Sequence, residues 1–151
     1  MSAPATWALV MNGTRARVLR GLEDGNGKDP IELLSRAPST HLRDVMADKP
    51  GRSFASEGGG RRSAMELGSD PIRRDMQDFA GEVADLLEAH RRSGDFQRLA
   101  IFAEPQMLGI LRAEFPATLW KAVFLDMPMN IVSLPERALR ERVLDYIHTK
   151  T

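Results

Sequence analysis

The residues best suited to chemistry gather between positions 48 and 69, where arginines flank a run of three glycines. Glycine has no Cβ, so the backbone of this run can adopt positive φ and turn several N–H groups toward one anion. The planar guanidinium groups nearby match the oxygens of phosphate or carboxylate. The expected ligand is phosphate, on a nucleotide or a nucleic acid, although a flexible arginine-bearing linker has the same composition. The residues predicted to bind it are Lys49, Arg52, Ser53, Gly58, Gly59, Gly60, Arg61 and Arg62.

The segment also leads toward a long predicted helix that begins near residue 70. Free N–H groups and the helix dipole both favour anions at a helix N-terminus, which would add to the attraction for phosphate. The glycine run itself fits neither the Gly-x-Gly-x-x-Gly spacing of dinucleotide-binding folds nor the Gly-x-x-x-x-Gly-Lys-Ser/Thr spacing of P-loops. The dinucleotide-binding and P-loop interpretations therefore fail on spacing, and no cofactor is expected.

An enzymatic alternative uses the same segment. Glu57 or Glu66 would act as the general base, and the glycine backbone would hold an oxyanion, in a hydrolase of an ester or a phosphoester. Two glutamates that are merely solvated would give the same sequence pattern as two catalytic bases. The serines of the segment are not predicted to be nucleophiles, because no nucleophile-elbow motif surrounds them. The three histidines lack the spacing of a zinc site and cysteine is absent, so neither a metal nor a disulfide is expected.

Composition narrows the class of protein. A chain of 151 residues with 42% hydrophobic and 28% charged residues is sufficient for one soluble domain with its own core. The formal net charge is +0, so any attraction to nucleic acid must come from a local patch. No stretch approaches the ~20 apolar residues of a membrane span, and no export signal is evident. We expect a cytoplasmic protein without membrane contact.

The first third of the chain predicts an antiparallel half-sheet. Residues 7–11 and 15–22 flank Asn12-Gly13, a pair typical of tight hairpin turns with positive φ. The second strand alternates, as a strand with one buried face would, and residues 31–36 predict a third strand. A short helix is expected from Ser39 or Thr40 through residue 47.

The remainder predicts a parallel unit with helices. Asp70 and Pro71 would start a helix over residues 70–92, with apolar residues at helical spacing and His90 at the rim of that face. Residues 99–103 predict a strand buried on both faces, followed by helices from Pro105 and Pro116, a strand at 122–125 and a final amphipathic helix. The sequence thus predicts one α/β domain with a mixed five-stranded sheet and flanking helices.

A family resemblance rests on these same residues. The hairpin, the stretch Asp48-Lys49-Pro50-Gly51-Arg52-Ser53-Phe54, the run Gly58-Gly59-Gly60-Arg61 and the long helix together resemble the bacterial host attachment proteins, over residues 7–144. That family is similar to the RNase H-like middle domain of eukaryotic- and archaeal-type peptide-chain release factors. In those factors a Gly-Gly-Gln loop before a long helix promotes hydrolysis of peptidyl-tRNA. Here glycine stands where that glutamine would be.

The resemblance implies an RNA- or ribosome-associated binding protein without hydrolytic activity. Ribosome, tRNA or other RNA is the expected partner, and Arg15 and Arg17 on the hairpin would extend the binding surface. Stop-codon reading is not expected, because 151 residues leave no room for the other release-factor domains. Direct adhesion, suggested by the family's name, is not expected in the absence of an export signal.

Overall fold

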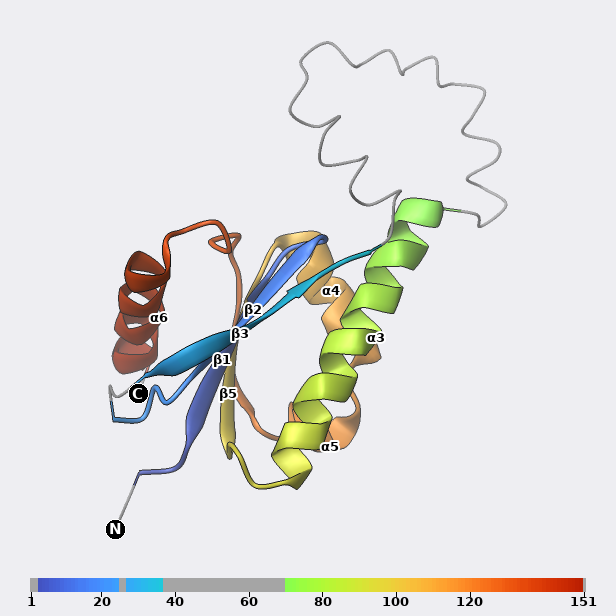
Figure 1. The fold of residues 1–151 in the computed structure, drawn as a ribbon. Coiled ribbons are helices and arrows are strands. Elements are labelled where there is room, and N and C mark those ends of the chain that lie inside the picture. The colour runs from blue at the N-terminus through green and yellow to red at the C-terminus, as the bar shows by residue number, and fades with distance from the viewer. Residues whose placement is uncertain (1–2, 25–26, 37–69, 151) are drawn as a thin grey trace.

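The computed structural model describes residues 3–24, 27–36 and 70–150. Its strands form one five-stranded mixed sheet with helices on both faces (Figure 1). The strands are β1 (Thr6–Met11), β2 (Arg15–Arg20), β3 (Lys28–Leu34), β5 (Arg98–Ala103) and β6 (Val123–Pro128). The helices are α3 (Pro71–Arg92), α4 (Pro105–Glu114), α5 (Ala117–Trp120) and α6 (Glu136–Lys150).

The sheet has the strand order β3-β2-β1-β5-β6. β1 pairs antiparallel with β2, and β2 pairs antiparallel with β3. β5 runs parallel to both β1 and β6. These pairings confirm the predicted mixed sheet, with an antiparallel half contributed early in the chain and a parallel half contributed later.

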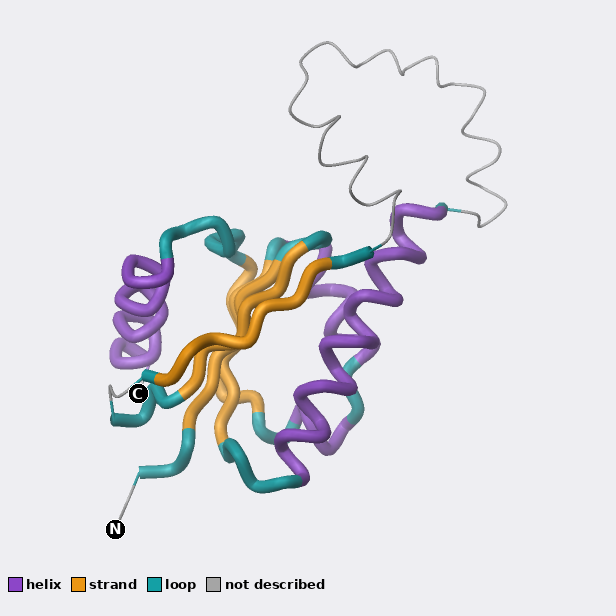
Figure 2. The backbone as a smooth tube through the Cα atoms, in the orientation of Figure 1, coloured by secondary structure: helices purple, strands orange, loops and turns teal. Residues whose placement is uncertain are grey.

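Three layers follow from the burial of both sheet faces. Figures 1 and 2 place α3, α4 and α5 on one side of the sheet and α6 on the other. Along β1, Trp7, Leu9 and Met11 belong to the core beneath α3 to α5, whereas Ala8 and Val10 belong to the core beneath α6. β1 is therefore buried on both faces at the centre of the molecule, and so is β5, as predicted.

Helix α3 forms where its sequence predicts. The Asp70 carboxylate accepts hydrogen bonds from the backbone N–H groups of Ile72 and Arg73, and Pro71 occupies the first helical position. Met76, Phe79, Ala80, Val83, Ala84 and Leu87 form the buried stripe. The helix ends before Gly94, which takes the positive φ of 80° that side chains disfavour.

The hairpin is confirmed, but its turn and its second strand differ from prediction. The Asn12 side chain closes the turn by accepting from the N–H groups of Thr14 and Arg15, each at 2.9 Å, and Gly13 does not need a positive φ. Residues 16–19 of β2 are all buried, so the prediction of one solvent-facing side is wrong. The second face is covered by α6 and the chain leading into it.

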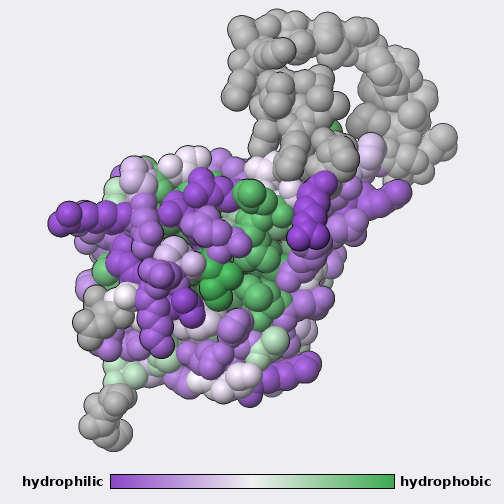
Figure 3. Space-filling model, in the orientation of Figure 1, coloured by the Kyte–Doolittle hydropathy of each residue, from purple (hydrophilic) through white to green (hydrophobic). Residues whose placement is uncertain are grey.

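β3 begins and ends earlier than the predicted 31–36 segment and forms one edge of the sheet. Pro30 lies within it, which an edge strand tolerates, and Lys28, Asp29 and Glu32 add the charges that discourage pairing with another sheet. Figure 3 shows apolar surface between the sheet and α3. Partly buried Ile31, Leu33 and Ile72 pack against the core there, and Leu34 is 66% exposed.

Two expectations fall outside the described residues: the short helix ending at residue 47 and the whole segment 48–69. Within the described residues, no helix combines the length and the apolar character needed to cross a bilayer.

Candidate functional site

The candidate site lies at the carboxyl edge of the sheet. The parallel strands β1, β5 and β6 all end here, and β3, antiparallel to β2, ends with them. Helix α3 begins at the same edge (Figure 1). Ligands of open α/β sheets bind outside the carboxyl ends of the strands. The chain leaves this edge at Arg36 and is described again from Asp70, so the predicted phosphate-binding segment is joined to it at both ends.

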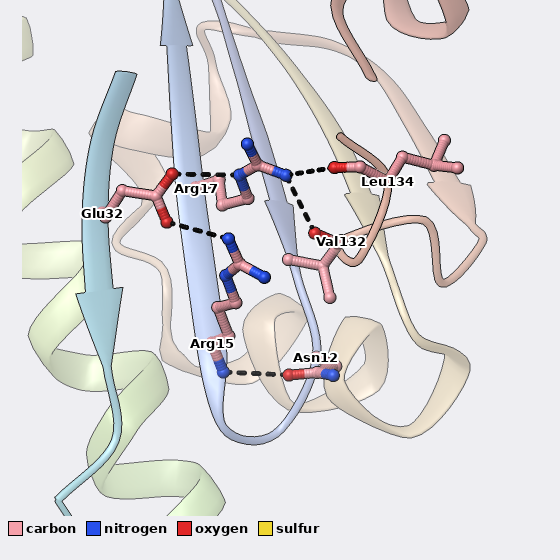
Figure 4. Close-up of polar contacts among 6 residues, drawn as sticks. All are labelled: Asn12, Arg15, Arg17, Glu32, Val132 and Leu134. Carbon is pink, nitrogen blue, oxygen red and sulfur yellow. Dashed lines mark hydrogen bonds and ion pairs between the residues drawn. The ribbon is translucent and has the colours of Figure 1, made fainter. Parts of the chain in front are cut away.

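Two arginines of β2 meet one carboxylate of β3 at this edge (Figure 4). Arg15 Nη2 lies 3.4 Å from Glu32 Oε1, and Arg17 Nε donates to Glu32 Oε2 at 3.0 Å. Arg17 Nη1 also donates to the backbone carbonyls of Val132, at 3.1 Å, and Leu134, at 2.6 Å. Arg17 thus joins β2 to β3 and to the chain that precedes α6.

The structure separates the roles expected for these two arginines. Arg17 is only 4% exposed and its guanidinium is occupied by three acceptors, so it cannot extend an external phosphate-binding surface. Its charge is instead used inside the fold. The Arg15 side chain is 37% exposed and has one long contact with Glu32, which leaves it accessible to an external ligand.

Further cations surround the edge, but the helix terminus is already occupied. Arg36, Arg73 and Arg74 are exposed. The Asp70 carboxylate takes the N–H groups of Ile72 and Arg73, at 3.1 and 3.2 Å, which are the groups a bound anion would need. The expectation of anion binding by the α3 N-terminus is therefore wrong. Side-chain guanidinium groups are the anion-binding elements that the described residues offer here.

The residues predicted to form the site itself, from Lys49 to Arg62, lie outside the described residues. So do Glu57 and Glu66, the candidate bases. The structure brings Arg15, Arg36, Arg73 and Arg74 to the edge from which that segment extends. Among the described residues, no three histidine or carboxylate side chains gather in a way that could hold a metal ion.

Sequence reasoning missed a polar cavity at the opposite, amino-terminal edge of the sheet. Its eight lining residues come from β1, β2, β3, α3 and the segments next to them, so no contiguous motif marks it. His90 is one of them, and it is partly buried at the rim of α3, as predicted. The only local signal was an aspartate five residues after that histidine.

Fold and site together define a three-layer α/β domain whose cationic carboxyl edge adjoins a Gly/Arg-rich segment. Residues 7–143 match the family described as "Protein required for attachment to host cells", and the chain belongs to this family. The matched range includes the five strands of the sheet except for Thr6, the first residue of β1, together with α3 to α5 and the segment 48–69. Among curated proteins, none matches this chain.

Proposed function

We propose that this protein is an RNA- or ribosome-associated binding protein, and that its segment 48–69 holds RNA phosphate at the carboxyl edge of the sheet. The observation that carries the proposal is the excess of cations in the part of the sequence that leaves this edge after β3 and returns to it at α3. Residues 36–74 contain eight lysines and arginines against five aspartates and glutamates, in a chain whose formal net charge is +0. Such a local patch supplies sequence-independent attraction to phosphate.

More specifically, we propose that this chain is a domain similar to the middle domain of peptide-chain release factors. The order of elements supports it, because the antiparallel strands β1 to β3 are followed by a glycine-rich segment and then by the long α3. Gly58, Gly59 and Gly60 would occupy the place of the Gly-Gly-Gln loop. Without the glutamine, the domain binds RNA and does not hydrolyse peptidyl-tRNA. We place it in the cytoplasm, where ribosomes are found, and an attachment phenotype would then be indirect.

The test is co-sedimentation of the purified protein with ribosomes across a salt series. Phosphate contacts release counterions, so the logarithm of the binding constant falls linearly with the logarithm of salt concentration. Replacing both Arg61 and Arg62 with alanine should weaken binding and reduce this slope by about 2, since each contact contributes roughly one.

A matched control removes two arginines elsewhere. Arg137 and Arg142 are exposed on α6, on the opposite face of the sheet from α3, and their replacement with alanine should leave binding unchanged. Equal loss in both double variants, or binding indifferent to salt, would contradict the proposal. The hydrolase alternative depends on Glu57 and Glu66, and no contact among the described residues favours it.

A further inference from the structure

The cavity at the amino-terminal edge of the sheet has a volume of about 280 Å³. It lies where β1 and β3 begin and where β2 and α3 end, away from the carboxyl edge described above. Its lining consists of Ala5, Trp7, Arg20, Gly21, Glu23, Lys28, His90 and Asp95. Small-molecule pockets usually start at ~300 Å³, so this volume suits a compact metabolite and is too small for a nucleotide.

The walls of the cavity are held in place by ring contacts and one short polar contact. The Trp7 indole lies against the His90 ring, with centroids 5.0 Å apart, and against Phe96 at 4.9 Å. His90 Nδ1 lies 2.7 Å from Asp95 Oδ2, which fixes the orientation of the imidazole. Trp7 is buried in the core, so this wall is part of the rigid fold.

One side of the cavity carries two positive charges. Arg20 and Lys28 are direct cross-strand partners in β2 and β3, an arrangement in which like charges disfavour the pairing. Arg20 donates through Nε and Nη2 to the Asp29 carbonyl, at 2.9 and 2.6 Å, which leaves Nη1 for another acceptor. A carboxylate bound between Arg20 and Lys28 would relieve their repulsion.

The cavity also carries two negative charges. Glu23 Oε1 accepts from the Thr6 N–H at 2.9 Å, and Asp95 holds His90 through Oδ2. Each carboxylate therefore has a second oxygen beyond these bonds. The two cations, Arg20 and Lys28, are matched in number by two carboxylates, so these four side chains carry no excess of charge to attract a simple anion or a simple cation. A molecule that carries both signs is complementary to it.

We propose that this cavity binds a zwitterion of the size of a free amino acid. The carboxylate of the ligand is held by Arg20 and Lys28, and its ammonium group by Glu23 and Asp95. Trp7 and His90 form the wall beside the bound molecule. No residue of the segment 48–69 belongs to this lining, so the proposal can be tested independently of RNA binding.

The test uses Trp7 as the reporter, since the chain contains only two tryptophans. In a Trp120→Phe background, fluorescence titration and calorimetry would be run with the twenty L-amino acids. Each binder would then be compared with the carboxylic acid lacking its ammonium group and with the amine lacking its carboxylate. At least one amino acid should bind about tenfold or more tightly than either analogue, because each analogue leaves charged groups unpaired.

Variants locate the site. Lys28→Gln and Glu23→Gln should each weaken binding by about tenfold, because each removes one charge contact to the ligand. Glu23→Gln keeps the oxygen that accepts from Thr6. Lys28→Gln keeps the Lys28 carbonyl that accepts from Arg140 and the backbone pairing with Arg20, so only the exposed side chain changes. Arg20 is left unchanged because it also holds the β2–β3 turn.

Lys121→Gln and Glu82→Gln, outside this lining, serve as matched controls that leave binding unchanged. Circular dichroism confirms that all variants fold. The proposal is overturned if no amino acid binds, if the carboxylic acid alone binds as tightly as the amino acid, or if the controls weaken binding as much as the cavity variants.

Discussion

Arg17 is a charged side chain used as an internal connector. Its guanidinium joins Glu32 on β3 to two backbone carbonyls, of Val132 and Leu134, in the chain before α6. The pair with Glu32 contributes little on its own, because the Glu32 side chain is 42% exposed. The two carbonyls matter more, since they lose their partner if the guanidinium is removed.

Arg17→Met should lower the free energy of unfolding by about 2–4 kcal/mol, because a buried hydrogen-bonded connection is broken while the stem volume is kept. Urea denaturation measures the loss. Arg15→Met on the same strand is the control, and its partly exposed, 3.4 Å contact predicts a change below about 0.5 kcal/mol. Similar losses in the two variants would show that the carbonyl contacts do not stabilise the fold.

Glu88 is a second residue whose side chain connects two elements, here α3 and α5. Its carboxylate accepts two hydrogen bonds from Arg91, at 2.8 and 2.9 Å, and one from Thr118 at 2.7 Å. The bonds from Arg91, and next the one from Thr118, lower the pKa of Glu88 from 4.5 to about 2, although burial opposes this shift. The charged form is therefore the one that the fold stabilises.

Because the folded pKa lies below the unfolded value, this stabilisation is present above pH 4.5 and is lost as the pH falls toward about 2. Glu88→Gln should be less stable than the wild type at pH 7, and the difference should shrink through this window. Thermal unfolding at a series of pH values measures it. Exposed Glu82→Gln, on the same helix, should show no such convergence, and a constant deficit for Glu88→Gln would disprove the linkage.

At the level of elements, α6 is fastened to the turn between β2 and β3 by one arginine. Arg140 donates to the carbonyls of Arg20, at 3.3 Å, and Lys28, at 3.2 Å. Gly27 makes room for it, since a Cβ at this position would lie 2.2 Å from the Arg140 guanidinium carbon. The obstruction is the end of a flexible side chain, so a larger residue displaces the guanidinium and leaves the backbone in place.

Gly27→Ala and Arg140→Ala should therefore remove the same contact. Each should lower the free energy of unfolding by about 1 kcal/mol, the usual net value for hydrogen bonds of this kind. The double variant should be little worse than either single variant, because the second change has nothing left to break. The measurement is a double-mutant cycle, in which denaturant unfolding is compared for the wild type, the two single variants and the double variant. Strictly additive losses of unfolding free energy would mean that Gly27 and Arg140 act separately.

At the level of the whole molecule, the sequence predicted those elements whose signals are local. The aspartate and proline at the start of α3, its apolar stripe and the apolar run of β5 each identify an element within a few residues. The mixed sheet follows from their order. The family match over residues 7–143 agrees with the resemblance read from the hairpin, the glycine run and the long helix.

What the sequence did not predict depends on partners far along the chain. β2 is buried on its second face because α6 and the residues before it cover that face. Arg17 has backbone carbonyls as partners, and no side-chain pattern marks these. The amino-terminal cavity combines residues from Ala5 to Asp95, each of which looks like an ordinary surface residue or core residue in its own segment.

The central position of β1 in the sheet has a consequence for how the chain folds while it is being synthesised. Trp7 pairs with Leu99, so one edge of the first strand stays empty until the chain has been synthesised past residue 103. One of its apolar faces is covered first by α3 and then by α4 and α5, whereas the other is covered only by α6, which comes last in the described chain. Pairings between distant residues slow folding, and exposed strand edges favour aggregation. On the translating ribosome, β1 therefore presents an unpaired edge until β5 has been made and an uncovered apolar face until α6 has been made.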